Sequence, residues 1–107
     1  MFVAMNRFRV REGREGDFEE MWRTRESYLA EVPGFVSFAL LKNETASEGA
    51  TEFISHSTWG SREDFWAWAN SDAFRKAHAQ SSVEGVLEGP PHVSLYGAVL
   101  EQARAGA

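Results

Sequence analysis

The chain begins with a segment whose side chains divide into two alternating sets, over residues 2–10. Because successive side chains of a strand point to opposite faces, this repeat of two predicts a β-strand. Residues 35–41, 52–59 and 92–100 predict three further strands, and the first of these is apolar on both of its sides. One side of the first strand carries Phe2, Ala4, Asn6, Phe8 and Val10.

A second pattern repeats every three or four residues and predicts helices. Residues 17–32 predict one amphipathic helix, with Asp17 as its N-cap and Pro33-Gly34 as its end. The apolar side chains of this helix form one stripe, which consists of Phe18, Met21, Trp22, Tyr28, Leu29 and Val32.

The region after Gly60 predicts a second helix and a short third helical piece. Ser61 and Asp64 have the spacing of a capping box, which favours a helix start at this point. Asn70-Ser71-Asp72 indicates a break and a new N-cap, so that His78 falls on the third helical piece. Polar residues 42–50 predict a hairpin loop. Residues 81–91, with two Gly and two Pro, predict a loop that is either a lid or only the connection to the last strand.

The resulting order β-α-β-β-α-β predicts an α+β, ferredoxin-like fold with a four-stranded antiparallel sheet. We expect a single domain over residues 1–100 and a flexible tail over residues 101–107. Helices on one side cover only one face of such a sheet, yet the strand at residues 35–41 is apolar on both sides. We therefore expect a homodimer whose sheets pack face to face, a dimeric α+β barrel.

Composition excludes several classes of protein. The 107 residues include 11 Lys and Arg and 16 Asp and Glu, a formal net charge of −5, so we expect neither nucleic acid nor membrane as a partner. The absence of Cys excludes disulfides and thiolate ligands. Because no apolar run approaches the roughly 20 residues of a membrane span and no signal peptide is recognised, we expect a cytoplasmic protein.

Three polar residues occupy positions where the pattern favours apolar ones. Asn6 lies among the apolar residues of the first strand, where it either hydrogen-bonds a neighbouring group or serves a ligand. Arg25 interrupts the first helical stripe, either as a residue at the edge of the stripe or as a partner for a bound carboxylate. His78 shares a helix face with Phe74, and it is either structural or a lone metal ligand.

The four tryptophans also need placement. Trp22 and Trp59 are predicted to lie in the core. Trp66 and Trp68 are about 200° apart on a helix, so that one of them must leave the main packing direction, where it could form a cavity wall.

These features together resemble the IsdG-type haem-degrading monooxygenases of the antibiotic-biosynthesis-monooxygenase (ABM) superfamily. The resemblance extends over about residues 2–100, through MNRFRV, VPGFVSFALL and STWGSREDFWAWANSDAFRKAHAQ. Its specific part is a trio of Asn, Trp and His, which falls on Asn6, Trp68 and His78. Arg25 is a looser match to an arginine near a haem propionate.

The resemblance implies that haem is both substrate and cofactor and that the ring is opened with O2 and electrons from an external reductase or small reductant. His78 would bind the iron, Trp68 would press on the ring and distort it, and Asn6 would hydrogen-bond near the bound oxygen. Arg25 would pair with a propionate. Iron release would follow ring opening.

Other interpretations remain open. A cofactor-free monooxygenase of the same superfamily, acting on quinols or other aromatics, would not require His78. A non-catalytic haem carrier would require His78 but would keep its haem in the presence of air and a reductant. The third interpretation is a small dimeric domain whose pocket is vestigial.

Overall fold

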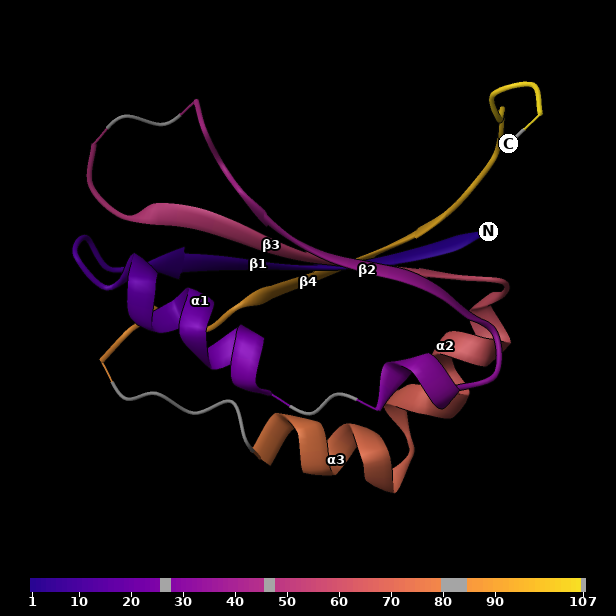
Figure 1. Ribbon diagram of the computed structural model, residues 1–107, viewed down its shortest axis with the longest axis horizontal. Helices are drawn as coiled ribbons and strands as arrows, with labels where there is room; N and C mark the ends of the chain where they lie inside the picture. Colours follow the sequence, from indigo (N-terminus) through magenta and orange to yellow (C-terminus); the bar gives the residue numbers. More distant parts are fainter. Residues whose placement is uncertain (26–27, 46–47, 80–84, 107) are drawn as a thin grey trace.

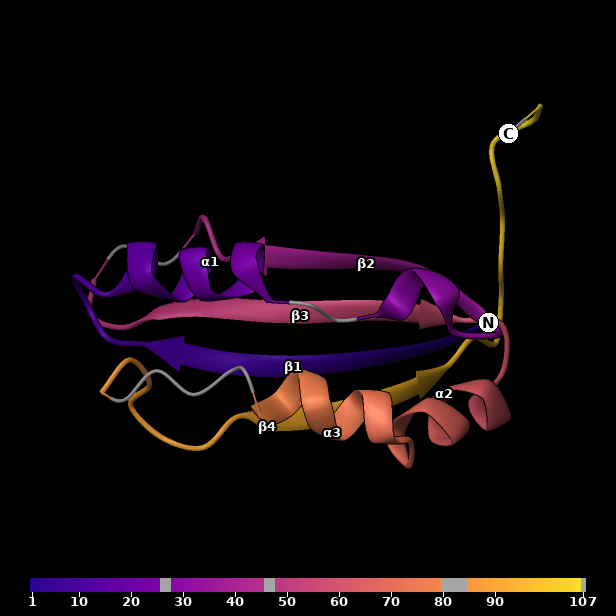
Figure 2. The ribbon, with the colours of Figure 1, turned by 60° about the horizontal axis from the view of Figure 1, so that its bottom comes forward.

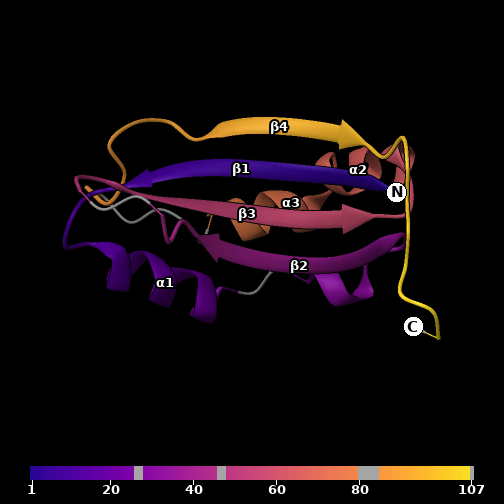
Figure 3. The same cartoon turned by 90° about the horizontal axis from the view of Figure 1, so that it is seen from above.

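The computed structural model describes residues 1–25, 28–45, 48–79 and 85–106, with side chains except at residues 78 and 79. Its centre is one antiparallel sheet with the strand order β2-β3-β1-β4 (Figure 3). The predicted α+β ferredoxin-like fold is therefore confirmed. The strands are β1 (Phe2–Val10), β2 (Phe35–Lys42), β3 (Thr51–Trp59) and β4 (His92–Gly97).

All described helices lie on one face of this sheet (Figures 1 and 2). They are α1 (Glu15–Thr24), the 3-10 turn η1 (Leu29–Glu31), α2 (Arg62–Ala69) and α3 (Asp72–Ala79). In Figure 3, α1 lies at the β2 edge, whereas α2 and α3 lie behind the central strands and β4. No described helix covers the opposite face, which we call the outer face. Within the described ranges, no helix has both the length and the apolar character that a membrane crossing requires.

The prediction of one helix over residues 17–32 is wrong. The helix α1 ends at Thr24, and Arg25 has an extended backbone with φ −73° and ψ 131°. Tyr28 then adopts a left-handed conformation with φ 60° before η1 begins. Asp17 is not the N-cap, because that position belongs to Arg14, whose Nε donates to the Asp17 carboxylate at 2.6 Å.

Two separate hydrophobic clusters explain the break in the helix, because the apolar residues of the stripe over residues 17–32 pack into both. Phe18 packs in a cluster at one end of the sheet, with Val10, Phe53 and Val86. Leu29 packs in a second cluster, with Phe2, Trp59 and Phe65. The helical repeat identifies both residues as apolar, but it does not predict that they pack in different parts of the core.

Other predicted boundaries agree with the structure more closely. The Ser61 hydroxyl accepts from the Asp64 backbone N–H at 3.1 Å, which confirms Ser61 as the N-cap of α2. The Asp64 carboxylate accepts from the Ser61 hydroxyl at 2.9 Å, in place of the backbone N–H that a complete capping box would use. The Ser71 hydroxyl accepts from the Phe74 backbone N–H at 3.2 Å, which confirms the new N-cap before α3. The last strand is shorter than predicted, because it ends at Gly97.

Candidate active site

A cavity of about 980 Å³ lies between the sheet and the helix layer. Its floor is the inner face of the sheet, and its walls come from α1, α2, α3 and the described end of the 81–91 loop. Most of its lining is apolar or aromatic, as is usual for a site that binds a small organic molecule. Its volume is at the upper end of the range of about 300–1,000 Å³ that is typical of such sites.

Asn6 lies on the floor of the cavity, in the middle of β1. Its register partners are Ser55 in β3 and Val93 in β4, so that it occupies a central position of the sheet. Among the described residues, its side-chain amide has no hydrogen-bond partner, and its polar atoms are not enclosed by protein. The amide is therefore free to bind a molecule in the cavity.

Trp68, near the C-terminal end of α2, forms part of the cavity wall. Its ring centroid lies 4.7 Å from that of Phe74 at an interplanar angle of 85°, and 5.3 Å from that of Trp59. Its indole Nε1 is buried and has no partner within the described part of the chain. Trp66 also reaches the cavity but is 45% exposed, so that the two tryptophans do take separate directions, as predicted.

Arg25 lines the cavity directly after α1. Its guanidinium carbon lies 4.4 Å from the centroid of the Trp22 ring, and its Nε is buried without a partner among the described groups. Burial lowers the pKa of this guanidinium from its usual value because desolvation disfavours the charged form. In the described part of the chain no carboxylate pairs with it, and a bound anionic group would supply this missing partner.

Sequence reasoning missed two lining residues. Trp22 packs against the core cluster around Phe18, as predicted, but it also lines the cavity, stacked on Phe38 at 5.5 Å and 24°. Its Nε1 is also buried and unpartnered among described residues. Ser55 is buried on the floor, and its signal was a small polar residue on a strand face that also carries Phe53 and Trp59.

His78 belongs to α3, next to the buried Ala77 and one turn after Phe74, which lines the cavity. Its side chain is outside the described residues, so its role as the iron ligand stays a prediction. Among the described side chains, no group of three or more His, Cys, Asp or Glu is placed to hold a metal ion.

The described end of the predicted lid is fixed to β1. The backbone N–H of Arg11 donates to the carbonyl of Val86 at 2.8 Å, and that of Glu88 donates to the carbonyl of Arg9 at 2.9 Å. Val86 is buried in the cluster around Phe18. A lid that included residues 85–88 would have to break these contacts, whereas residues 81–84 lie outside the described ranges.

Comparisons with known proteins place this geometry in context. The sequence model described as antibiotic biosynthesis monooxygenase matches residues 1–80. The haem degrader MhuD from Mycobacterium tuberculosis, solved with two haems bound in its active site, is 28% identical with a TM-score of 0.73. The match covers 96% of this chain and 100% of that one. The comparison with curated proteins gave no match.

Two more distant structures share the fold. SnoaB, a cofactor-independent oxygenase from Streptomyces nogalater, is 18% identical with a TM-score of 0.70, over 96% of this chain and 97% of that one. An antibiotic biosynthesis monooxygenase structure from Bacillus cereus is 19% identical with a TM-score of 0.78, over 99% and 98%. At these identities the likeness extends to the fold alone.

Proposed function

We propose that this chain, which belongs to the antibiotic biosynthesis monooxygenase family, binds haem in the cavity beneath its sheet and opens the porphyrin ring oxidatively. The observation that carries the proposal is that Asn6, Arg25 and Trp68, which are distant in sequence, all line one cavity beside α3. The resemblance to haem-degrading monooxygenases implies roles toward haem for the same three residues. The 28% identity to a haem degrader over nearly the whole chain supports the same function.

The cavity suits a flat, largely apolar molecule with anionic groups at its edge. Aromatic rings of Trp22, Trp68 and Phe74 line its walls, and they provide apolar surface for a macrocycle. Arg25 is a buried cation without a described partner, at a position where a propionate would complete its hydrogen bonding. The residues present therefore fit haem.

Each residue has a distinct role in this proposal. His78 of α3 would bind the iron, Arg25 would hold a propionate, and Asn6 would donate a hydrogen bond from the floor of the cavity. Trp68 is held between Trp59 and Phe74, so that it resists displacement. It would therefore press on the ring of a bound haem. When bound, the iron of haem would supply the activation of oxygen.

The proposal includes partners that lie outside a single chain. Electrons come from an external reductase or a small reductant, and the protein acts as a homodimer in the cytoplasm. Ring opening releases the iron. The alternative of a cofactor-free monooxygenase needs no haem, and the alternative of a haem carrier needs no electrons, so each of them has a distinct experimental outcome.

Titration with hemin tests the proposal directly. We expect a saturable shift of the Soret band with the unaltered chain and a displaced, weakened Soret spectrum with His78→Ala. His56→Ala is the matched control, because His56 lies on the outer face of the sheet. It pairs with Met5, and Met5 lies on the face opposite to that of its neighbour Asn6. A chain that shows no Soret shift would exclude haem, and equal spectra for the two His variants would exclude His78 as ligand.

Adding ascorbate in air to the hemin complex then separates the enzyme from a carrier. A degrader loses its Soret band and releases iron that a ferrous chelator detects, whereas a carrier keeps the band. We expect Trp68→Phe to slow the loss of the band by about tenfold or more, because a smaller ring distorts the macrocycle less. Hemin affinity of this variant should change much less than the rate.

A further inference from the structure

Two serines on the floor of the cavity differ in what their hydroxyl groups do. Ser55 and Ser57 are two residues apart on β3 and therefore share the inner face of the sheet. The Ser57 hydroxyl accepts from the Trp59 indole Nε1 at 3.0 Å and lies 3.5 Å from the carbonyl of Ala4. Ser57 thus satisfies a donor of the core, because Trp59 is fully buried.

The Ser55 hydroxyl has no such role. Ser55 is only 6% exposed, yet its hydroxyl has no hydrogen-bond partner among the described residues and is not enclosed by protein atoms. A polar group in an apolar cleft is unfavourable unless water or a ligand satisfies it. The accessible part of this hydroxyl therefore faces the cavity and is available to a bound molecule.

Asn6 is the cross-strand partner of Ser55. Side chains directly opposite each other on one face of an antiparallel pair lie roughly 5 Å apart at their Cβ atoms, so the amide and the hydroxyl are neighbours. The same row of the sheet continues with Leu40 in β2 and Val93 in β4, so two polar groups at the centre have apolar residues on either side. The row presents two adjacent donors at one point of the floor.

We propose that Ser55 and Asn6 form a two-point site for the small ligand on the sheet side of the haem. This inference rests on the proposed function, in which His78 of α3 would hold the iron, because Asn6 and Ser55 line the cavity from the sheet and not from the helix layer. Azide, or the dioxygen that turnover would consume, has lone pairs that could accept from both donors. Ser55 acts here as a positioning residue beside Asn6.

Azide binding to the ferric hemin complex tests this role without turnover. We expect Ser55→Ala and Ser55→Val to raise the dissociation constant for azide by roughly threefold to tenfold, the loss of one hydrogen bond. Ser55→Thr should keep an affinity close to that of the unaltered chain. Thr and Val have nearly the same shape, so their difference isolates the hydroxyl.

Ser57→Ala is the matched control on the same strand face. It should lower the thermal midpoint of unfolding, because it removes the acceptor of the buried Trp59 indole, and it should change azide affinity less than Ser55→Ala does. Ser55→Ala should show the reverse, with an altered azide affinity and an unchanged midpoint.

The outcomes separate this inference from the proposed function. If hemin binds and azide affinity is the same in all Ser55 variants, the haem proposal stands and the two-point site is wrong. If Thr weakens azide as much as Val does, volume and not the hydroxyl is responsible, and the inference is again wrong. If the unaltered chain binds no hemin, both fail.

Discussion

Arg25 is the residue whose environment most clearly indicates a bound ligand. Its guanidinium lies against the Trp22 ring and is partly removed from water, yet no described acid neutralises it. An uncompensated charge in such a place destabilises the free protein, so the residue is explained more readily by binding than by folding. The proposed function assigns this charge to a haem propionate.

We predict that Arg25→Gln raises the dissociation constant for hemin by about tenfold or more, the loss of a hydrogen bond to a charged group. Arg23→Gln is the matched control, because Arg23 is exposed on α1 and pairs with Glu19. Hemin whose propionates are methyl esters should bind both variants equally. If the ester form still distinguishes them, or if free hemin does not, Arg25 does not bind a propionate.

Some site residues were visible in the sequence because they violate a local pattern. Asn6 and Arg25 interrupt apolar rows, and both line the cavity. Ser55 and Trp22 were missed for opposite reasons. A serine in a strand that also contains Ser57 and Thr58 looks ordinary, and an indole on a helical stripe looks like core. Such a residue either packs in the core or lines a cavity, depending on where the neighbouring helix or strand lies. The sequence repeat does not predict that position.

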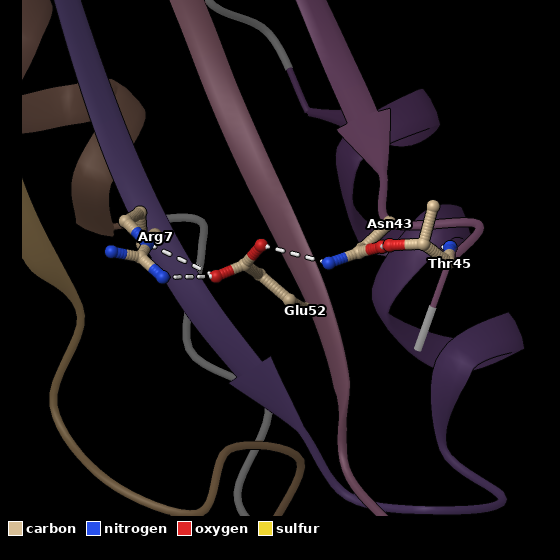
Figure 4. Close-up of polar contacts among 4 residues, drawn as sticks. All are labelled: Arg7, Asn43, Thr45 and Glu52. Carbon is tan, nitrogen blue, oxygen red and sulfur yellow. Dashed lines mark hydrogen bonds and ion pairs between the residues drawn. The ribbon is translucent and has the colours of Figure 1, made fainter. Parts of the chain in front are cut away.

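At the scale of elements, β1 and β3 are joined on the outer face by charge as well as by their backbone ladder. Arg7 donates from Nε and Nη2 to the Glu52 carboxylate at 3.0 and 2.5 Å, and the Asn43 amide donates to the other oxygen at 3.2 Å (Figure 4). The hydrogen bond from Arg7 is the main cause that lowers the pKa of Glu52 from its usual value. The ionised form of Glu52 is therefore favoured in the folded chain.

The pH dependence of stability follows from this direction. Because the pKa of Glu52 is lower in the folded than in the unfolded chain, its contribution is present above the unfolded value, near 4.5, and is lost as pH falls through the folded value. We predict that Glu52→Gln lowers the urea midpoint slightly at pH 7 and has progressively less effect toward pH 3. Urea unfolding at several pH values measures this, with Glu63→Gln on α2 as control. A difference that persists unchanged at pH 3 would contradict the linkage.

Elements were predictable to the extent that their partners are local. The strand pattern and the caps at Ser61 and Ser71 depend on neighbours within a few residues, and both are found in the structure. The break at Arg25 depends on two clusters at different ends of the sheet, so the stripe over residues 17–32 predicted a continuous helix instead. The end of β4 at Gly97 was likewise not marked by composition.

At the scale of the whole molecule, one face of the sheet remains without cover from a described helix (Figures 1 and 3). By alternation from the register, Leu41 and Tyr96 belong to this outer face, and they are 45% and 52% exposed. Val3 and Ile54 lie between them on the central strands and are half-buried. The exposed apolar side chains of Leu41 and Tyr96 support the expected homodimer, whose interface would also include the Arg7–Glu52 pair of the same face.

We predict that Leu41→Glu and Tyr96→Glu each raise the dissociation constant of the dimer by at least about tenfold. A two-fold interface receives the charge twice, and each copy must be desolvated. Ala30→Glu is the control, because Ala30 is exposed on η1 at the helix side. Light scattering during size-exclusion chromatography should give twice the mass of one chain for the unaltered protein and for the control.

A single-chain mass for the unaltered protein, or dimers in all variants, would contradict the outer face as the dimer interface.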